Sequence, residues 1–502
     1  MKYTLYYTNK KMGGPAMTKE QLLHELSFGA VDSESEENLD KIFIQTKNFD
    51  EFLMPNVALL LGCKGAGKSA LYRLFTKYED SAREMAKHAI DDAYLVAGIG
   101  FKDLPEMDDM QLLNHLEENT ISSEAAWKIY IAYKIIQALY SKYSIICGSK
   151  CRRVLQKSHM IKDFRFSSIF ERIFEKFIGE PPKIDQIDFK NVSISLSKKS
   201  RVSAYDLLGE IDSYLKKHQK TVWFLLDKID ELFPSKTSVR KECIEGLFSA
   251  YIDFVSRYQN IKLKIFLRTD IWNTLSFVNK SHLTDKTTTI VWNNNALKHL
   301  LLKRAAYNCN INNLLCRASP NNDWESNIDG CFNVLFPEKV YPGSREAKTM
   351  SWIIERSTDG LGGVYPREII NFANYAKQAE LKLEDDGLKQ EFDCETPLIS
   401  GLSIRNAFSS VSKVKVQSYL SEFEHLSKHF ERFTGQTTAE YLQADLIQLM
   451  SGLQPEGEEM IRQLHETGVI AYSSGEILTQ EAKIIVPRLF RNGLGIVTMG
   501  RP

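Results

Sequence analysis

The stretch VALLLGCKGAGKSALYRLF covers residues 57–75 and decides how the rest of the chain is interpreted. Its first five residues are apolar and read as a buried strand, and the segment that follows has the spacing GxxxxGKS at residues 62–69. Residues 70–75 then read as the beginning of a helix. Strand, loop and helix in this order are the context in which the motif binds phosphate, so we predict a phosphate-binding loop. The alternative is a glycine-rich turn with an incidental lysine.

The residue types in this loop suit the binding of a nucleoside triphosphate with Mg²⁺. Gly62, Gly65 and Gly67 let backbone N–H groups turn inward and approach the β-phosphate. Lys68 would reach the β- and γ-phosphates, and Ser69 would place its hydroxyl on Mg²⁺. The positive end of a helix starting near Ser69 would face the same phosphates. The predicted nucleotide-binding residues of this segment are Gly62, Cys63, Lys64, Gly65, Ala66, Gly67, Lys68, Ser69 and Ala70.

A second apolar run, Val222–Leu226, ends in Asp227 and has the pattern of a Walker B strand. Asp227 would hold Mg²⁺, directly or through water. Asp230 or Glu231 could polarise the attacking water, and the sequence leaves the choice between them open.

The pattern Asp-x-x-Asp-Glu at residues 227–231, after an apolar run, resembles the Walker B of the STAND group of signalling ATPases, which includes the NACHT and KAP branches. This resemblance implies that the nucleotide is ATP. The chain departs from the pattern at Lys228, where related AAA+ enzymes carry the acid that serves as catalytic base. Slow hydrolysis, as in a nucleotide-gated switch, therefore agrees with the resemblance as well as a motor does.

Two later segments extend the expected site. The run Ile261–Leu267 reads as a neighbouring strand, and Arg268, Thr269 or Asp270 at its end could contact the γ-phosphate or the attacking water. The alternative is that Arg268 only pairs with Asp270 or another acid.

The segment Gly362-Gly-Val-Tyr-Pro-Arg367 is similar to the Gly-x-Pro-Arg element of STAND and origin-recognition-type ATPases, with one extra residue. The resemblance implies that Arg367, on the first turn of a lid helix, reports on the γ-phosphate. A structural salt bridge is the alternative.

Composition sets limits on the class of protein. The chain has 502 residues, 43% of them hydrophobic and 25% charged, and a formal net charge of +0, so it has no overall basic field for nucleic acid. Its eight cysteines show no zinc-binding spacing, and no apolar run is long enough to cross a bilayer. We expect a soluble, cytoplasmic protein without membrane contact.

We expect four parts along the chain: an N-terminal helical segment (1–50), a P-loop core (51–290) with a helical and basic insert at about 105–205, a helical lid (291–400), and a C-terminal domain (401–502). In the insert, residues 125–143 show helical spacing, and residues 150–170 combine basic side chains with phenylalanines. Such a run can bind single-stranded nucleic acid, although a solvated helix is commoner.

The C-terminal residues predict a winged-helix-like module. Expected helices at residues 437–450 and 456–465 precede two apolar runs, 468–472 and 484–490, separated by a polar turn. Lys483, Arg488 and Arg491 could contact DNA phosphates, or the module could pack on a partner protein.

Together these patterns predict an α/β P-loop NTPase of the additional-strand type, with a parallel sheet, a helical insert, a helical lid and a C-terminal winged-helix-like module. We expect an ATP- and Mg²⁺-binding ATPase that acts as a switch or assembly element, as a homo-oligomer or with an effector protein. Residues 28–36, together with the loop, resemble predicted bacterial ATPases from defence-associated gene neighbourhoods, which implies a role in anti-phage defence. The alternatives are a nucleic-acid-stimulated ATPase or loader, and an ATP-bound scaffold without turnover.

Overall fold

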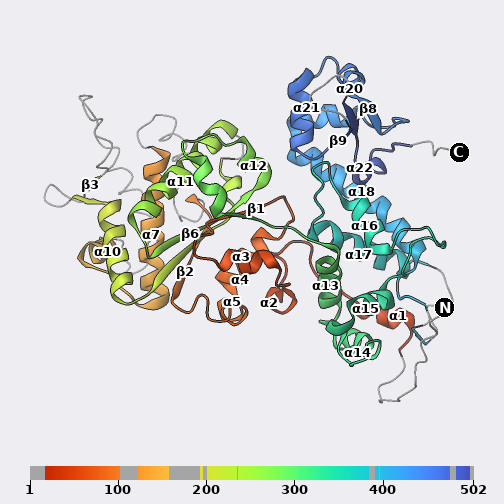
Figure 1. Ribbon diagram of the computed structural model, residues 1–502, viewed down its shortest axis with the longest axis horizontal. Coiled ribbons are helices and arrows are strands. Elements are labelled where there is room, and N and C mark those ends of the chain that lie inside the picture. Colours follow the sequence, from red (N-terminus) through yellow and green to blue (C-terminus); the bar gives the residue numbers. More distant parts are fainter. Residues whose placement is uncertain are drawn as a thin grey trace. The chain divides into compact units, whose positions relative to one another are not determined.

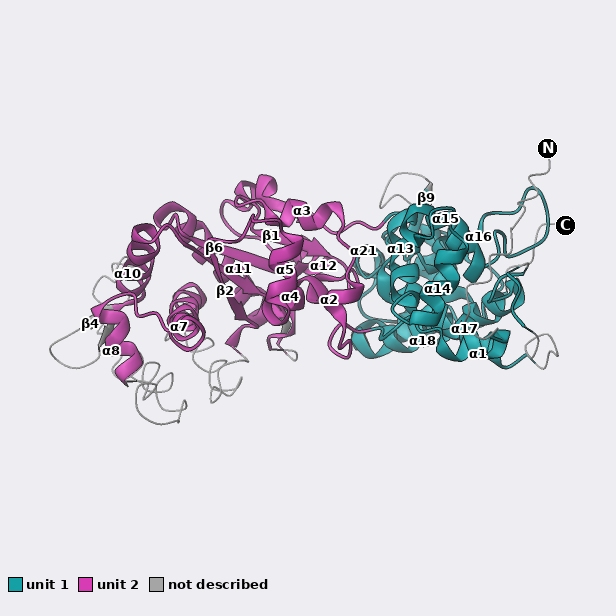
Figure 2. Cartoon of the chain, turned by 90° about the horizontal axis from the view of Figure 1, so that it is seen from below, with its two compact units in different colours: residues 1–31, 293–502 teal, residues 32–292 magenta. Residues whose placement is uncertain are grey.

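The chain forms two compact units. The computed structural model describes residues 17–101, 122–157, 193–195, 201–233, 236–383, 391–394, 396–474 and 482–497. One unit contains residues 32–292, and the other contains residues 1–31 together with residues 293–502 (Figure 2). The chain passes from one unit to the other between Trp292 and Asn293, close to the expected boundary after residue 290. The finer division into four parts stays a prediction.

A five-stranded parallel sheet forms the centre of the unit at residues 32–292 (Figure 1). Its order is β2 (Ala93–Gly98), β5 (Thr221–Leu226), β6 (Ile261–Arg268), β1 (Leu59–Gly62) and β7 (Thr287–Thr289). β6 lies between the strand that precedes the glycine-rich loop and the strand that precedes Asp227, which is the arrangement of an additional-strand P-loop NTPase. The predicted fold class is confirmed, and β7 is a further strand that we did not predict.

Helices cover both faces of this sheet because the side chains of β5 alternate between two apolar layers. Trp223 packs against Phe75 on one face, with 6.3 Å between ring centroids. Phe224 packs against Tyr130 on the other face, at 6.0 Å. The first face is covered by α3 (Lys47–Leu53) and α4 (Lys68–Lys77), and the second by α7 (Ser123–Tyr143) and α11 (Thr237–Arg257). The helix predicted at residues 125–143 is thereby confirmed.

The remaining elements of this unit lie around the sheet. They are α2 (Leu39–Ile42), α5 (Glu79–Met85), α8 (Ser149–Lys157), β3 (Ser193–Ser195), β4 (Arg201–Ser203), α10 (Ala204–Lys217), η2 (Ile229–Glu231), α12 (Thr269–Thr274) and η3 (Lys280–Lys286). Of the basic and aromatic run at residues 150–170, the structure places residues 150–157 on α8, and the other residues lie outside the described part.

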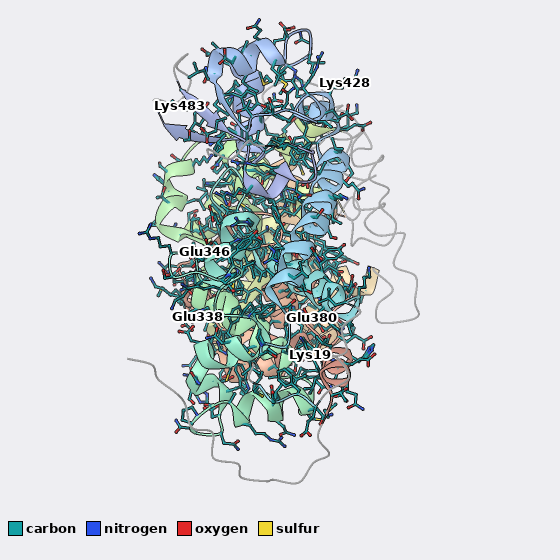
Figure 3. The ribbon with its side chains drawn as sticks, turned by 90° about the vertical axis from the view of Figure 1, so that its right-hand side faces the viewer. Lys19, Glu338, Glu346, Glu380, Lys428 and Lys483 are labelled. Atoms are coloured by element: carbon teal, nitrogen blue, oxygen red, sulfur yellow. The ribbon has the colours of Figure 1, made fainter. Side chains whose placement is uncertain are left out.

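The second unit is mostly helical. Its elements before the C-terminal module are α1 (Lys19–Glu25), α13 (Asn294–Ala305), α14 (Cys309–Arg317), η4 (Trp324–Asn327), α15 (Ile328–Leu335), α16 (Thr349–Ser357), α17 (Pro366–Leu381), α18 (Gly401–Glu422), η6 (Glu424–Leu426) and α19 (Ser427–Glu431). An ion pair of 2.7 Å between Lys19 and the buried Glu380 ties α1 to α17 (Figure 3). No helix among the described residues is long and apolar enough to cross a membrane.

Arg304 lies in the last turn of α13. It is buried, and its guanidinium donates to the backbone carbonyls of Phe28 at 2.8 Å and Ala30 at 3.2 Å. The arginine therefore holds the N-terminal segment against the helical unit.

The C-terminal module has the element order of a winged helix. An antiparallel sheet in the order β8 (Glu440–Leu442), β10 (Lys483–Ile485), β9 (Ala471–Ser474) packs with α20 (Gln443–Leu449) and α21 (Gly457–Glu466). The helix predicted at residues 437–450 is confirmed for α20 and wrong for the residues before it, among which Glu440–Leu442 form β8. The apolar run predicted at 484–490 is divided by Pro487, after which α22 (Arg488–Arg491) begins.

Candidate nucleotide-binding site

The glycine-rich loop joins the end of β1 to the beginning of α4. Gly65 and Gly67 have φ values of 85° and 103°, which residues other than glycine adopt only at an energetic cost. The backbone N–H of Ala66 donates to the carbonyl of Cys63 at 3.2 Å and closes the turn. α4 begins at Lys68, one residue before the expected start, so its N-terminal amides lie at the end of this loop.

Lys68 is buried, and its ammonium group lies on the loop itself. Its Nζ donates to the carbonyls of Gly62 at 2.8 Å and Cys63 at 3.1 Å. Burial lowers the pKa of Lys68, and the carboxylates of Asp230 and Asp227 oppose that shift. The lysine is therefore held within the loop, close to the two acids predicted for the same site.

Asp227 follows β5 and is almost fully buried, with an exposed fraction of 2%. Its backbone N–H donates to the carbonyl of Gly98 at 3.1 Å, and the nearby hydroxyl of Ser69 favours the charged form of its carboxylate. Burial raises the pKa of Asp227 to about 6, although Ser69 and Lys68 lower it. Among the described residues its Oδ2 atom has no hydrogen-bond partner.

The two predicted metal ligands lie near each other, since Ser69 lowers the pKa of Asp227, and their chemistry fits Mg²⁺. A serine hydroxyl and a carboxylate are hard oxygen donors of the kind that this ion binds through one or two protein ligands. An unpartnered, buried carboxylate oxygen is costly, and a cation or its bound water would satisfy it.

The acids after Asp227 lie on η2 and differ in environment. Asp230 is half-buried and acts electrostatically on both Lys68 and Asp227. Glu231 is exposed, and its charge acts on Lys228. The structure therefore brings Asp230, more than Glu231, toward the predicted phosphate site.

Lys228 follows Asp227 and is the residue at which the chain departs from the Walker B pattern that it resembles. It has φ 60°, the left-handed region that a long side chain adopts only under constraint, and it forms an ion pair with Glu34. The Glu34 carboxylate raises the pKa of Lys228. The basic side chain is thereby engaged by an acid of the segment that precedes β1.

Two polar side chains at the end of β6, Arg268 and Thr269, differ in their hydrogen bonding. Arg268 binds Asp270 through two hydrogen bonds, Nε to Oδ1 at 3.0 Å and Nη2 to Oδ2 at 2.7 Å, which is the alternative expected from the sequence. The hydroxyl of Thr269 is buried and has no hydrogen-bond partner among the described residues. Because Gly62 and Arg268 are paired in register, Thr269 lies at the same sheet edge as the loop.

Arg367 belongs to the other unit. Pro366 is the first residue of α17, as predicted, and Arg367 follows it on the first turn. Its neighbour Glu368 is buried and pairs with Lys415 at 2.7 Å. Contact between Arg367 and a phosphate stays a prediction.

Sequence reasoning missed two residues near the loop. Arg240 on α11 donates to the backbone carbonyl of Asp230 at 3.3 Å and lies among the charges of Asp230, Arg268 and Asp270. Trp292 donates from Nε1 to the carbonyl of Ala66 at 2.9 Å. The sequence signal for the contact of Trp292 with Ala66 is the tryptophan itself, which stands just before the polar residues 293–295.

Comparisons with known proteins gave structural matches alone, since neither a protein-family model nor a curated protein matches the chain. Cdc6p from Pyrobaculum aerophilum is 12% identical, with 87% of each chain covered and a TM-score of 0.29. A Drosophila ORC structure bound to DNA is 11% identical, covers 97% of this chain and 95% of that chain, and has a TM-score of 0.33. The Aeropyrum pernix ORC1 protein in complex with DNA is 11% identical, with 89% and 90% covered and a TM-score of 0.32. At such low similarity we assign no function from these proteins, and the P-loop NTPase fold rests on the strand order and the loop of this chain.

Proposed function

We propose that the chain binds ATP with Mg²⁺ at the loop of residues 62–69 and acts as a slowly hydrolysing, nucleotide-gated switch. The observation that carries this proposal is the buried carboxylate of Asp227, whose Oδ2 atom has no hydrogen-bond partner among the described residues and whose charge acts on Lys68 of the loop. This arrangement costs stability unless a cation and an anion complete it. A nucleotide with Mg²⁺ supplies both.

In the proposed complex, Lys68 exchanges the carbonyls of Gly62 and Cys63 for phosphate oxygens. The N-terminal amides of α4 and the backbone amides of the loop hold the phosphates by hydrogen bonds and by the helix dipole. Mg²⁺ bound by Ser69 and Asp227 neutralises phosphate charge. Thr269 supplies a buried hydroxyl for the γ-phosphate or the attacking water.

Slow turnover follows from the acids of η2. Asp230 is our candidate for orienting the attacking water, because its charge acts on Lys68, whereas Glu231 is exposed. Lys228 leaves the position of the usual base without a carboxylate. The preference for ATP and the STAND-type role in anti-phage defence rest on the resemblance in sequence.

The second candidate is an ATPase coupled to nucleic acid through the winged-helix-like module. Two of the three basic residues predicted to contact phosphates have protein partners: Arg488 pairs with Glu355 at 3.2 Å, and Nε of Arg491 donates to the carbonyl of Val486 at 2.8 Å. Lys483 on β10 is exposed (Figure 3).

The helix α21, which precedes β9 in this module, has an acidic surface. Glu458 and Glu459 on α21 are exposed, and Arg462 is engaged by Glu459 at 2.5 Å and Glu466 at 3.1 Å. Carboxylates repel a phosphate backbone. This surface favours a partner protein over DNA as the target of the switch.

The proposal is tested by titrating Mg²⁺-ATP into the wild type, Lys68→Ala and Lys77→Ala in a calorimeter. Lys77→Ala is the matched control, because it removes an exposed lysine from the same helix, α4, outside the loop. We expect the wild type and Lys77→Ala to bind and Lys68→Ala to lose at least tenfold in affinity. Equal affinity of Lys68→Ala and the wild type would refute the site.

Hydrolysis is then measured with and without single- and double-stranded DNA and RNA. Loss of turnover in Asp230→Asn but not in Glu231→Gln supports the assignment of the acid. Turnover that rises with DNA and falls with salt supports the nucleic-acid alternative. Tight binding without any turnover supports the scaffold alternative.

A further inference from the structure

The segment Ile290–Trp292 runs alongside the phosphate loop, although no sequence motif marks it. The backbone N–H of Ile290 donates to the carbonyl of Leu61 at 2.9 Å and continues the pairing of β7 with β1. The Trp292 indole N–H then donates to the carbonyl of Ala66 at 2.9 Å. A Cβ atom built on Gly67 would lie 3.9 Å from Cζ2 of Trp292, so the indole ring lies against Ala66 and Gly67.

Asn48 at the start of α3 fixes this segment from its other side. Its Nδ2 donates to the carbonyl of Thr289 at 2.7 Å, and its Oδ1 accepts from the backbone N–H of Val291 at 3.0 Å. Main-chain groups on both sides of Ile290 are therefore tied to a helix of the same unit. The position of the Trp292 backbone is defined independently of the loop that its side chain contacts.

The contact with Ala66 controls the direction of the next backbone amide. In a planar trans peptide, the carbonyl of Ala66 and the N–H of Gly67 point in opposite directions. Holding this carbonyl toward Trp292 turns the N–H of Gly67 away from the indole. Gly67 has no side chain to limit its backbone, so without the hydrogen bond this peptide plane has more freedom to rotate.

We propose that Trp292 is a positioning residue for phosphate binding: its indole N–H holds the peptide between Ala66 and Gly67 with the Gly67 amide directed at the phosphates. This inference rests on the proposed function of the loop. Pre-ordering a donor reduces the ordering cost that binding must otherwise meet. The ligand feature that responds to Trp292 is the phosphate chain, and the base plays no part.

The test uses Trp292→Phe in the full-length chain, because phenylalanine keeps an aromatic ring and removes the N–H donor. Trp272→Phe is the control, since Trp272 belongs to the same unit and its ring packs on Phe248 and Phe277. Affinities for Mg²⁺-ATP, Mg²⁺-ADP and Mg²⁺-tripolyphosphate are measured by calorimetry. We expect Trp292→Phe to weaken all three by a common factor of about 3 to 10, as for one lost hydrogen bond, and Trp272→Phe to weaken none.

Each other outcome is informative. Unchanged affinities in Trp292→Phe overturn the inference while leaving the proposed function standing. Weaker binding of the nucleotides with unchanged binding of tripolyphosphate also overturns it, because the ring would then act on the base. If the wild type binds none of the three ligands, the proposed function itself fails.

Hydrogen–deuterium exchange of the ligand-free protein gives a second measurement that does not depend on affinity. Residues 62–68 should exchange faster in Trp292→Phe than in the wild type and Trp272→Phe. Equal exchange in all three proteins shows that the hydrogen bond does not order the loop, and the inference is then wrong.

Discussion

Replacing Asp227 by asparagine is expected to make the ligand-free protein more stable and to remove its response to Mg²⁺-ATP. Asparagine has nearly the same shape as aspartate, so it keeps a side-chain oxygen near the Ser69 hydroxyl but carries no charge. In the wild type, burial opposes ionisation of Asp227 more strongly than Lys68 and Ser69 favour it, which is why its pKa is raised to about 6. The substitution removes this burial cost.

The magnitude follows from the pKa. The shift in the pKa of Asp227 from its ordinary value of 3.8 to about 6 corresponds to about 3 kcal/mol, at about 1.4 kcal/mol per pKa unit. This is an upper limit, because asparagine leaves Lys68 with one fewer attracting charge and brings a buried NH₂ group that needs an acceptor. We therefore expect a gain of about 1–3 kcal/mol in the free energy of unfolding at pH 8, or about 2–10 °C in the melting temperature.

The gain should depend on pH in a defined direction. Because the folded-state pKa lies above the unfolded value, the native protein binds more protons between pH 3.8 and about pH 6, and wild-type stability falls as the pH rises through this range. Asp227→Asn lacks this contribution. Its advantage over the wild type should therefore be small near pH 4.5 and complete by pH 8.

The assay is thermal unfolding of the wild type, Asp227→Asn and the control Asp80→Asn, an exposed acid of α5, at pH 5 and pH 8, with and without Mg²⁺-ATP. Ligand at 100 times its dissociation constant stabilises the wild type by about 2.7 kcal/mol, and Asp227→Asn should lose most of that increase. If ligand-free Asp227→Asn is less stable than the wild type at pH 8, the argument that burial outweighs the favourable interactions of the Asp227 carboxylate is refuted. A full response of Asp227→Asn to Mg²⁺-ATP would refute Asp227 as a metal ligand.

Four further substitutions test other parts of the structure. Burial lowers the pKa of Lys264 to about 7, while its Nζ donates to three carbonyls. The free energy of unfolding of the wild type should therefore rise by about 1 kcal/mol per pH unit from pH 7 to pH 9. Urea unfolding of Lys264→Met should not show this rise. Gly360→Ala places a Cβ atom 2.1 Å from the carbonyl oxygen of Ile470 and should lower the free energy of unfolding by more than about 2 kcal/mol. Gly209→Ala in α10 places its Cβ atom in open space and should raise the free energy of unfolding by about 1 kcal/mol. Thr269→Val should reduce the turnover number by about tenfold or more with little change in Mg²⁺-ATP affinity, and an unchanged turnover number would exclude the hydroxyl from the reaction.

The sequence predicted the centre of the fold because its signals are local. The apolar runs at β1, β5 and β6 are each followed by glycine or polar residues. A short segment therefore predicts both the strand and the candidate site residues at its carboxyl end. β7 was missed because three threonines carry no apolar pattern, and its strand character depends on pairing with β1.

Contacts between distant residues could not be predicted from local patterns. The hydrogen bond from Trp292 to Ala66 joins residues 226 positions apart. The bonds of Arg304 to Phe28 and Ala30 join residues more distant still, so an arginine that reads as a surface residue of a helix is in fact buried. The first part of the helix expected at residues 437–450 was wrong for a related reason, since β8 is defined by its partner β10.

The turn before α17 would carry any displacement of Arg367 to the C-terminal module. The carboxylate of Asp359 accepts from the backbone N–H groups of Leu361 and Gly363, both at 3.0 Å, and closes the turn. The backbone N–H of Gly360 donates at 2.7 Å to the carbonyl of Gly468, at the start of the segment that enters β9. Moving the first turn of α17 therefore requires Gly468 to follow or the bond to break.

If Arg367 reads the γ-phosphate, this bond gives the nucleotide a mechanical path to the winged-helix-like module. Coupling between two binding sites is reciprocal, so a partner bound at the module should change nucleotide affinity by the factor with which nucleotide changes partner affinity. Arg367→Ala should remove this mutual effect while Mg²⁺-ATP still binds through Lys68. Retention of the full effect in Arg367→Ala would show that the nucleotide state reaches the module by another route.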